Sequence, residues 1–194
     1  MKKRGIFAVF LALLLCSAGN VWAEGWYSGL EVGGGVSFEL ALGDMRDHER
    51  GNLNLSLDAA WPLPLGFSKD GFISAVGLTA QTGVVVPVGK KDYIDSWRSM
   101  DFGLGAYVDL RISPLITVRP GLAADMRLNI VSSESRCADG AYLDFGVKAG
   151  ATVLFDAFKN GILLKLGAGY AFFPEKEHIC RYICINAGAT YKFN

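Results

Sequence analysis

Hydrophobic and polar residues alternate along the C-terminal segment of the chain with a period of two. One face carries Ile183, Ile185, Ala187, Ala189, Tyr191 and Phe193, and the other carries Cys184, Asn186, Gly188, Thr190 and Lys192. Successive side chains of a β-strand point to opposite faces, so this pattern predicts a strand with one apolar and one polar face. Such a strand is typical of a barrel whose outer face meets lipid and whose interior is polar.

The same alternation recurs through most of the chain, and no helical period of 3.6 residues appears after the first 23 residues. Turn residues divide the chain into eight predicted strands, at about 26–42, 52–61, 72–88, 99–112, 115–131, 141–155, 162–173 and 182–193. Each is at least as long as the roughly 9 to 11 residues that a tilted strand needs to cross a bilayer. The sequence therefore predicts an all-β fold, an eight-stranded antiparallel up-and-down transmembrane β-barrel over residues 24–194.

The charged residues of the predicted strands share one face with most of the glycines. They are Glu31, Glu39, Asp58, Asp101, Asp109, Arg111, Arg119, Asp125, Arg127, Asp144, Lys148, Lys165 and Lys192. The opposite face is apolar and carries aromatic residues toward both strand ends, as the interfacial girdles of a membrane barrel do. A soluble barrel with its apolar face inside is the alternative, but glycines beside long charged side chains favour a narrow polar interior.

Seven acids and six bases would nearly neutralise one another in that interior. An eight-stranded barrel is only wide enough for side chains to fill it, and an unpaired buried charge costs several kcal/mol. We therefore expect paired charges and bound water rather than an open pore. The alternative for the same residues is an ion pathway.

The first 23 residues have the three parts of a secretory signal peptide. A basic start at 2–4 precedes an apolar core at 6–15, and Ala23 offers a cleavage site before Glu24. Lipid attachment at Cys16 is disfavoured because a bulky leucine precedes it. The chain has 19 basic and 19 acidic residues, and removal of the leader leaves 16 basic residues against 19 acidic ones. This slightly acidic balance does not provide the excess of basic residues that is typical of nucleic-acid-binding proteins.

The connections between the predicted strands fall on two sides of the membrane. The outer ones are 43–51, 89–98, 132–140 and 174–181, and the inner ones include tight turns at 113–114 and 156–161. The inner connection at 62–71 is longer and more apolar than a simple hairpin turn. The membrane interface is one location that we consider for this connection.

The spacing of Asn186, Gly188, Tyr191 and Phe193 matches the polar, glycine, aromatic, aromatic sorting signal of outer-membrane barrels. With this signal, the mature chain resembles the small eight-stranded outer-membrane barrels, a class that includes the OmpX and OmpW families and OmpA-type membrane domains. The resemblance implies residence in the outer membrane of a two-membrane bacterium. It also implies outer-membrane lipid and the barrel-assembly machinery as partners, and it leaves the oligomeric state open.

Three cysteines remain after processing: Cys137, Cys180 and Cys184, all toward the outer side. That location is oxidising, so a disulfide is expected there. Cys137 with Cys180 is the preferred pair, and Cys137 with Cys184 is the alternative. Together with His178 they are also possible zinc ligands, but their spacing matches no known zinc motif. No phosphate-binding or dinucleotide-binding glycine motif occurs, so no cofactor is expected.

The predicted role is non-catalytic: envelope structure, surface contact or adhesion, with an extracellular ligand contacted through the outer loops. The resemblance to OmpW-like barrels implies a second possibility, which is passage of a small hydrophobic molecule through a side opening in the wall. Pro120 on the apolar face of the fifth strand is the candidate for such an opening, because proline removes a ladder hydrogen bond.

A lipid A-modifying enzyme is the third possibility, and the scarcity of histidine argues against it. Such an enzyme needs a histidine beside a serine on the outer rim, so that a base can activate a nucleophile. Only His48 and His178 are present, and neither has a serine two positions on, although a neighbouring outer loop carries Ser132, Ser133 and Ser135.

Overall fold

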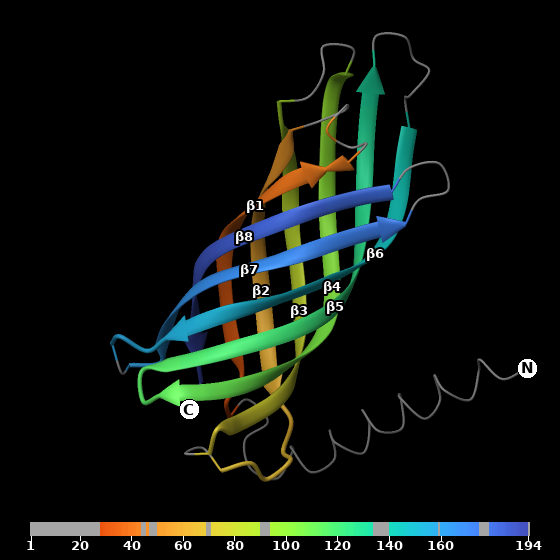
Figure 1. The fold of residues 1–194 in the computed structure, drawn as a ribbon. Coiled ribbons are helices and arrows are strands. Elements are labelled where there is room, and N and C mark those ends of the chain that lie inside the picture. The colour runs from red at the N-terminus through yellow and green to blue at the C-terminus, as the bar shows by residue number, and fades with distance from the viewer. Residues whose placement is uncertain are drawn as a thin grey trace, which may run out of the picture.

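The computed structural model describes residues 28–43, 46, 50–68, 71–89, 94–133, 140–158, 160–174 and 179–193. Eight strands make up the fold (Figure 1): β1 Glu31–Leu42, β2 Gly51–Pro62, β3 Ile73–Val88, β4 Ile94–Ser113, β5 Ile116–Ser133, β6 Gly140–Phe155, β7 Ile162–Pro174 and β8 Ile179–Lys192. Each strand pairs antiparallel with its sequence neighbours, and β1 also pairs with β8, which closes the barrel. The predicted eight-stranded antiparallel up-and-down β-barrel is confirmed.

A long antiparallel ladder between β1 and β8 closes the barrel. It runs from the pair Glu31 and Lys192 to the pair Leu42 and Arg181. At its centre Gly35 lies opposite Gly188, and a Cβ added to Gly188 would lie 2.3 Å from the carbonyl oxygen of Gly34. Glycine is therefore required at position 188 for the first and last strands to meet at this distance.

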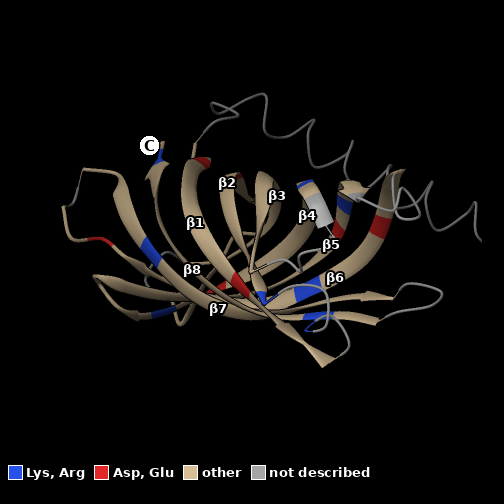
Figure 2. Ribbon diagram, turned by 90° about the horizontal axis from the view of Figure 1, so that it is seen from above, with Lys and Arg blue, Asp and Glu red and all other residues tan. Residues whose placement is uncertain are grey.

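The strands turn their apolar face outward and their charged face inward. Leu57, Leu104 and Phe145 are each more than 60% exposed, whereas Glu39 and Asp101 are each only 1% exposed. Figure 2 shows the basic and acidic segments distributed over several strands around the wall. In the part of the chain that the structure describes, no helix is long and apolar enough to cross a membrane.

The barrel has two different ends. The outer end has the connections 43–50, 89–93, 134–139 and 175–178, and the inner end has 63–72, 114–115 and 156–161. At the outer end β6 begins at Gly140 but pairs with β7 only from Val147 onward, so β4, β5 and β6 rise beyond the ends of β7 and β8 (Figure 1).

Strand ends are where the sequence prediction was least accurate. The first strand was predicted to begin at 26, but β1 begins at Glu31, after a turn in which Gly29 has a φ of 78°. A residue with positive φ cannot continue an extended strand. At the outer end, β4 begins at Ile94 instead of 99 and β8 at Ile179 instead of 182. These extensions carry the outward-facing residues Arg98 and Arg181. In the sequence, charged residues at these positions are typical of loops.

The β4 to β5 ladder is interrupted beside Pro120. The ladder pairs Tyr107 with Gly121 and resumes in the same register at Leu110 and Val118, leaving out the two positions between them. On the other side of β5, Pro120 keeps its place opposite Ala151 of β6. The interruption is therefore confined to one edge of β5, as expected for a residue without a backbone N–H.

Candidate functional site: the barrel interior

Five charged side chains contact one another in the outer half of the barrel interior. This outer ion cluster consists of Glu39 on β1, Asp101 on β4, Asp125 and Arg127 on β5, and Lys148 on β6. Arg127 donates to Asp101 through Nε at 2.7 Å and Nη2 at 3.1 Å, and to Glu39 through Nη2 at 2.6 Å. Lys148 Nζ lies 2.9 Å from Asp101, 2.8 Å from Asp125 and 3.6 Å from Glu39.

Strand register explains why these charges meet. Asp101 and Arg127 lie directly opposite each other on the β4 to β5 ladder. Asp125 shares the inward face of β5 with Arg127 because the two residues are two positions apart. Glu39 comes from β1, on the opposite wall of an eight-stranded ring. The cluster therefore joins both sides of the barrel through charge-assisted hydrogen bonds.

An apolar group of side chains covers the outer ion cluster at the outer end. This outer plug consists of Ala41 on β1, Ala171 and Phe173 on β7, and Cys180, Tyr182 and Cys184 on β8, with Trp97 on β4 packed against it. The guanidinium carbon of Arg127 lies 4.9 Å from the ring centroid of Phe173 and 5.2 Å from that of Tyr182. At this distance aromatic rings attract a cation, so the plug and the cluster stabilise each other.

The sequence analysis did not identify the outer plug. The sequence does indicate the plug, through an exception to the alternating pattern. The inward positions at the outer ends of β7 and β8 hold apolar or aromatic residues, where most other strands carry charges. Phe173 is only 1% exposed. A search for apolar residues on the polar face of predicted strands would have found it.

A second group of charges lies at the inner end of the interior. This inner ion cluster consists of Arg119 on β5, Glu31 on β1 and Asp109 on β4, with Lys192 on β8 at 3.7 Å from Glu31. Arg119 donates to Asp109 through Nε at 2.7 Å and Nη2 at 2.8 Å, and to Glu31 through Nη1 at 2.7 Å. Its guanidinium lies 4.1 Å from the ring centroid of Tyr107.

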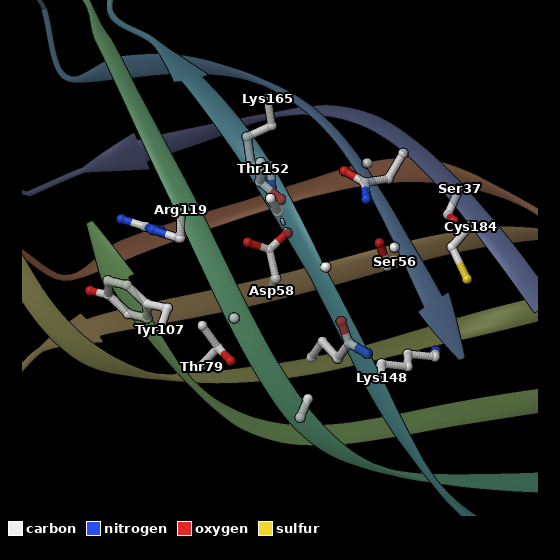
Figure 3. Close-up of a pocket in the computed structure, with 18 of the residues that line it drawn as sticks. Ser37, Ser56, Asp58, Thr79, Tyr107, Arg119, Lys148, Thr152, Lys165 and Cys184 are labelled. Carbon is white, nitrogen blue, oxygen red and sulfur yellow. Dashed lines mark hydrogen bonds and ion pairs between the residues drawn. The ribbon is translucent and has the colours of Figure 1, made fainter. Parts of the chain in front are cut away.

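A cavity of about 240 Å³, lined by both polar and apolar residues, separates the two clusters. Figure 3 shows Arg119 and Lys148 at its border, with Ser56, Thr79 and Thr152 among the residues around it. Lys165 donates a hydrogen bond to Asp58 within this region. A cavity of this size has room for several water molecules.

Not every buried polar atom in this interior is hydrogen-bonded. Among the described residues, Asn54 Oδ1, Thr190 Oγ1 and both carboxylate oxygens of Asp125 have no hydrogen-bond partner. Asp125 is held instead by its charge contact with Lys148. The outer ion cluster has three carboxyl groups and two basic side chains.

All thirteen charged residues that the sequence assigns to the interior are buried or half-buried. All but Asp144 and Arg111 belong to the two clusters or to the contact between Lys165 and Asp58, and each of these ion pairs joins two different strands. Asp144 accepts a hydrogen bond from Asn129, whose Oδ1 in turn accepts one from Trp97 Nε1 at 3.2 Å. Arg111 lies half-buried near the inner end of β4.

The structure describes only some of the cysteine and histidine residues that the sequence analysis considered. Cys137, His48 and His178 lie outside the described residues, so a bridge from Cys137 to Cys180 or Cys184 stays a prediction. Cys180 and Cys184 are both buried on the inward face of β8, and Cys184 borders the cavity. Across the described ranges, no group of three or more His, Cys, Asp or Glu side chains is arranged to hold a metal ion.

The four residues of the predicted sorting signal lie on β8 or just after it. Asn186 and Gly188 face inward and are half-buried, whereas Tyr191 and Phe193 are exposed on the outer wall. The two rings meet edge to face with centroids 5.0 Å apart. They form part of the aromatic surface at the inner end.

Comparison with known proteins identifies the fold. Neisserial surface protein A has a TM-score of 0.61 at 17% identity, over 86% of this chain and 98% of that one. Ail, the attachment invasion locus protein of Yersinia pestis, has a TM-score of 0.56 at 13% identity, over 86% of this chain and 99% of that one. This is the fold of the small outer-membrane barrels.

A major outer membrane protein from Thermus thermophilus is also similar, with a TM-score of 0.50 at 11% identity over 84% of this chain and 99% of that one. No family model matches the sequence, and no curated protein matches it. The predicted resemblance to small eight-stranded outer-membrane barrels is confirmed at the level of fold. A shared fold carries many functions, so the role of this chain has to be argued from its own site.

Proposed function

We propose that this chain is an integral outer-membrane barrel that acts as a closed structural and surface-contact protein. Residues 1–23 direct export and are removed, and the apolar outer wall contacts lipid. The barrel-assembly machinery inserts the chain through the signal formed by Asn186, Gly188, Tyr191 and Phe193. The proposal contains no catalytic step and no cofactor.

The closed outer end of the interior carries this proposal. Arg127 binds Asp101 on one wall and Glu39 on the opposite wall, and the rings of Phe173 and Tyr182 cover it. A solute entering from outside would have to displace two aromatic rings and separate a buried ion pair. A buried charge separated from its partner is costly, so the arrangement favours contact over conduction.

The shape of the outer end supports a role in surface contact. The strands β4, β5 and β6 project beyond the ends of β7 and β8 on this side (Figure 1). Among the similar structures, one is of an attachment invasion locus protein, which was also solved in complex with the heparin analogue sucrose octasulfate. The heparin analogue is a ligand of Ail. For this chain, the shared fold supports the proposal that the outer loops contact an extracellular ligand.

Three measurements test the proposal. Cell fractionation should find the protein in the outer membrane, and electrophoresis should show a mobility change on boiling, because a closed barrel resists detergent until heated. In planar bilayers the protein should form no stable channels above background. Reproducible single-channel steps in a sample with the mobility of the folded barrel would contradict the closed interior.

One pair of observations favours a second function, passage of a small hydrophobic molecule through the wall. An apolar groove of about 730 Å³ lies on the outer face, lined by residues that include Ala80, Leu104 and Ala124. The interrupted ladder at Pro120 lies on the same strand as Ala124. If passage occurs there, Pro120→Ala should slow uptake of a hydrophobic fluorescent dye by cells that produce the protein.

A further inference from the structure

The inner connection between β2 and β3 differs from the other two inner turns in length and chemistry. Residues 63–72 form it, and its only charged residues, at 69 and 70, lie outside the described chain. Leu65 is 58% exposed, Phe67 41% and Phe72 64%. An ordinary hairpin turn is short and polar, so this connection presents a surface that turn formation does not explain.

Two neighbouring turns continue this exposed apolar surface. Arg111 N–H donates to the carbonyl oxygen of Phe72 at 2.7 Å, which places Phe72 beside the end of β4. The turn after β4 is joined to the next one by a hydrogen bond of 2.9 Å from Asp156 N–H to the carbonyl oxygen of Leu115. Ile112 near the end of β4 and Leu115 and Phe158 in these turns are exposed. We call the six residues Leu65, Phe67, Phe72, Ile112, Leu115 and Phe158 the inner apolar rim.

The inner apolar rim is continuous with the outer wall of the barrel. An irregularity in the β3 to β4 register between Ile73 and Ala75 turns Ile73 outward, where it pairs with Leu110. Ile73 is 42% exposed. Ile112 follows Leu110 by two residues on the same outward face of β4. The apolar wall therefore extends past the strand ends on this side without a charged side chain between them among the described residues.

The backbone of the connection suits the interface rather than the hydrocarbon core. Leu63 N–H donates to Val76 O at 2.8 Å, Leu65 N–H to Leu63 O at 2.8 Å, and Gly71 N–H to Ser68 O at 2.9 Å. Gly66, with a φ of 72°, allows the sharp turn between them. A connection outside the ladder suits the interface, where water and lipid headgroups can bond its backbone, because unpaired backbone groups are not tolerated in hydrocarbon.

We propose that the inner apolar rim inserts into the inner-leaflet interface of the membrane, with its side chains among phospholipid acyl chains. The proposal rests on the membrane placement proposed above. Lipid is the occupant because the surface continues the wall that already faces lipid, and because Leu and Phe are residues with which interfacial segments insert. The rim would anchor one side of the barrel more deeply than the other.

Tryptophan substitutions in the otherwise unchanged chain test the insertion. Leu65→Trp and Phe67→Trp are compared with Leu104→Trp on the lipid-facing wall and Ser96→Trp at the exposed outer end of β4. Each variant is folded into phosphatidylglycerol vesicles with or without bromine on the acyl chains, and the signal of the parent, with its own tryptophans, is subtracted. The rim probes should be quenched by brominated lipid roughly twofold more than the Ser96 probe, and less by iodide.

The control on the wall separates failure of this inference from failure of the proposed function. If Leu104→Trp is quenched by brominated lipid but both rim probes behave like Ser96→Trp, the rim faces water and the insertion is wrong. That outcome would point to a periplasmic protein as its partner. If Leu104→Trp is not quenched either, the membrane placement itself fails and the insertion fails with it. A variant that shows no mobility change on boiling is replaced by Phe158→Trp, for which the same quenching is expected.

Discussion

Arg127 and Asp101 face each other directly across the β4 to β5 ladder and are joined by two parallel hydrogen bonds of 2.7 and 3.1 Å. Both side chains are buried. Because Arg127 also binds Glu39 of β1, this pair connects opposite walls and lies directly beneath the outer plug. It is the contact on which the closed outer half of the interior depends.

Replacing Arg127 by methionine should strongly destabilise the barrel. The change leaves Asp101 and Glu39 buried without their guanidinium partner, and we expect a loss of about 3 to 5 kcal/mol. Urea unfolding in detergent micelles, followed by tryptophan fluorescence, measures it. The control is Arg98→Met, an exposed residue at the same end, which should change stability by about 0.5 kcal/mol or less. Similar losses for both variants would mean that the buried pair is unimportant.

Asp101→Asn combined with Arg127→Met should cost less than the two single changes added together. Asp101→Asn takes one carboxylate from Arg127, and Arg127→Met takes the guanidinium from Asp101, whereas the double change removes both members of this pair and the interaction between them is lost only once. A double-mutant cycle with the same unfolding assay measures the coupling. Additive losses would show that the two side chains act independently.

Phe173→Ala should open the outer end of the interior and expose Cys184. The ring of Phe173 is almost fully buried, so its removal should cost about 3 to 5 kcal/mol and leave a gap above the outer ion cluster. In the parent, Cys184 should resist a water-soluble thiol reagent, and in the variant it should react, as mass spectrometry of the peptide would show. The outward-facing control Tyr170→Ala should leave Cys184 protected; labelling in that variant too would contradict the plug.

Gly188→Val should prevent closure of the barrel. A Cβ at this position would lie 2.3 Å from Gly34 O and 2.8 Å from Gly35 Cα, and backbone atoms cannot move aside as a side chain can. Refolding from urea without assembly machinery should therefore give little of the form whose mobility changes on boiling. Ala187→Val, one residue away on the exposed face, should refold normally. Normal refolding of both variants would show that the seam tolerates a side chain.

Pro120→Ala should repair the ladder between β4 and β5. The alanine supplies the missing N–H, and one additional backbone hydrogen bond stabilises by about 1 kcal/mol. Hydrogen exchange should slow at the positions of β4 and β5 that lie within the interruption. Leu122→Ala on the same face is the control, since it removes apolar surface and adds no donor, and it should not slow exchange. Unchanged exchange in Pro120→Ala would assign the interruption to another cause.

The period of two was sufficient to predict the eight strands and, in their regular parts, which residues share a face of the wall. At Ile73 it was not, because the irregular register of β3 turns that side chain outward. In an antiparallel sheet, side-chain direction follows directly from position along the strand, so Leu104 and Asp101 are assigned to opposite faces without any tertiary information. Strand ends were less predictable, because Arg98 and Arg181 continue their strands with charges that resemble loop residues.

The sequence alone therefore determined the strand number and the division of each strand into a charged and an apolar face, since these depend only on local alternation. The placement of glycines and aromatic residues then predicted which face points inward. Only the tertiary structure decided which charges meet, because that depends on register and on contacts across the interior, as when Glu39 of β1 binds Arg127 of β5. It also decided that Phe173 and Tyr182 cover this pair. Their apolar side chains stand at polar-face positions, and closure of the sheet brings them together over one guanidinium.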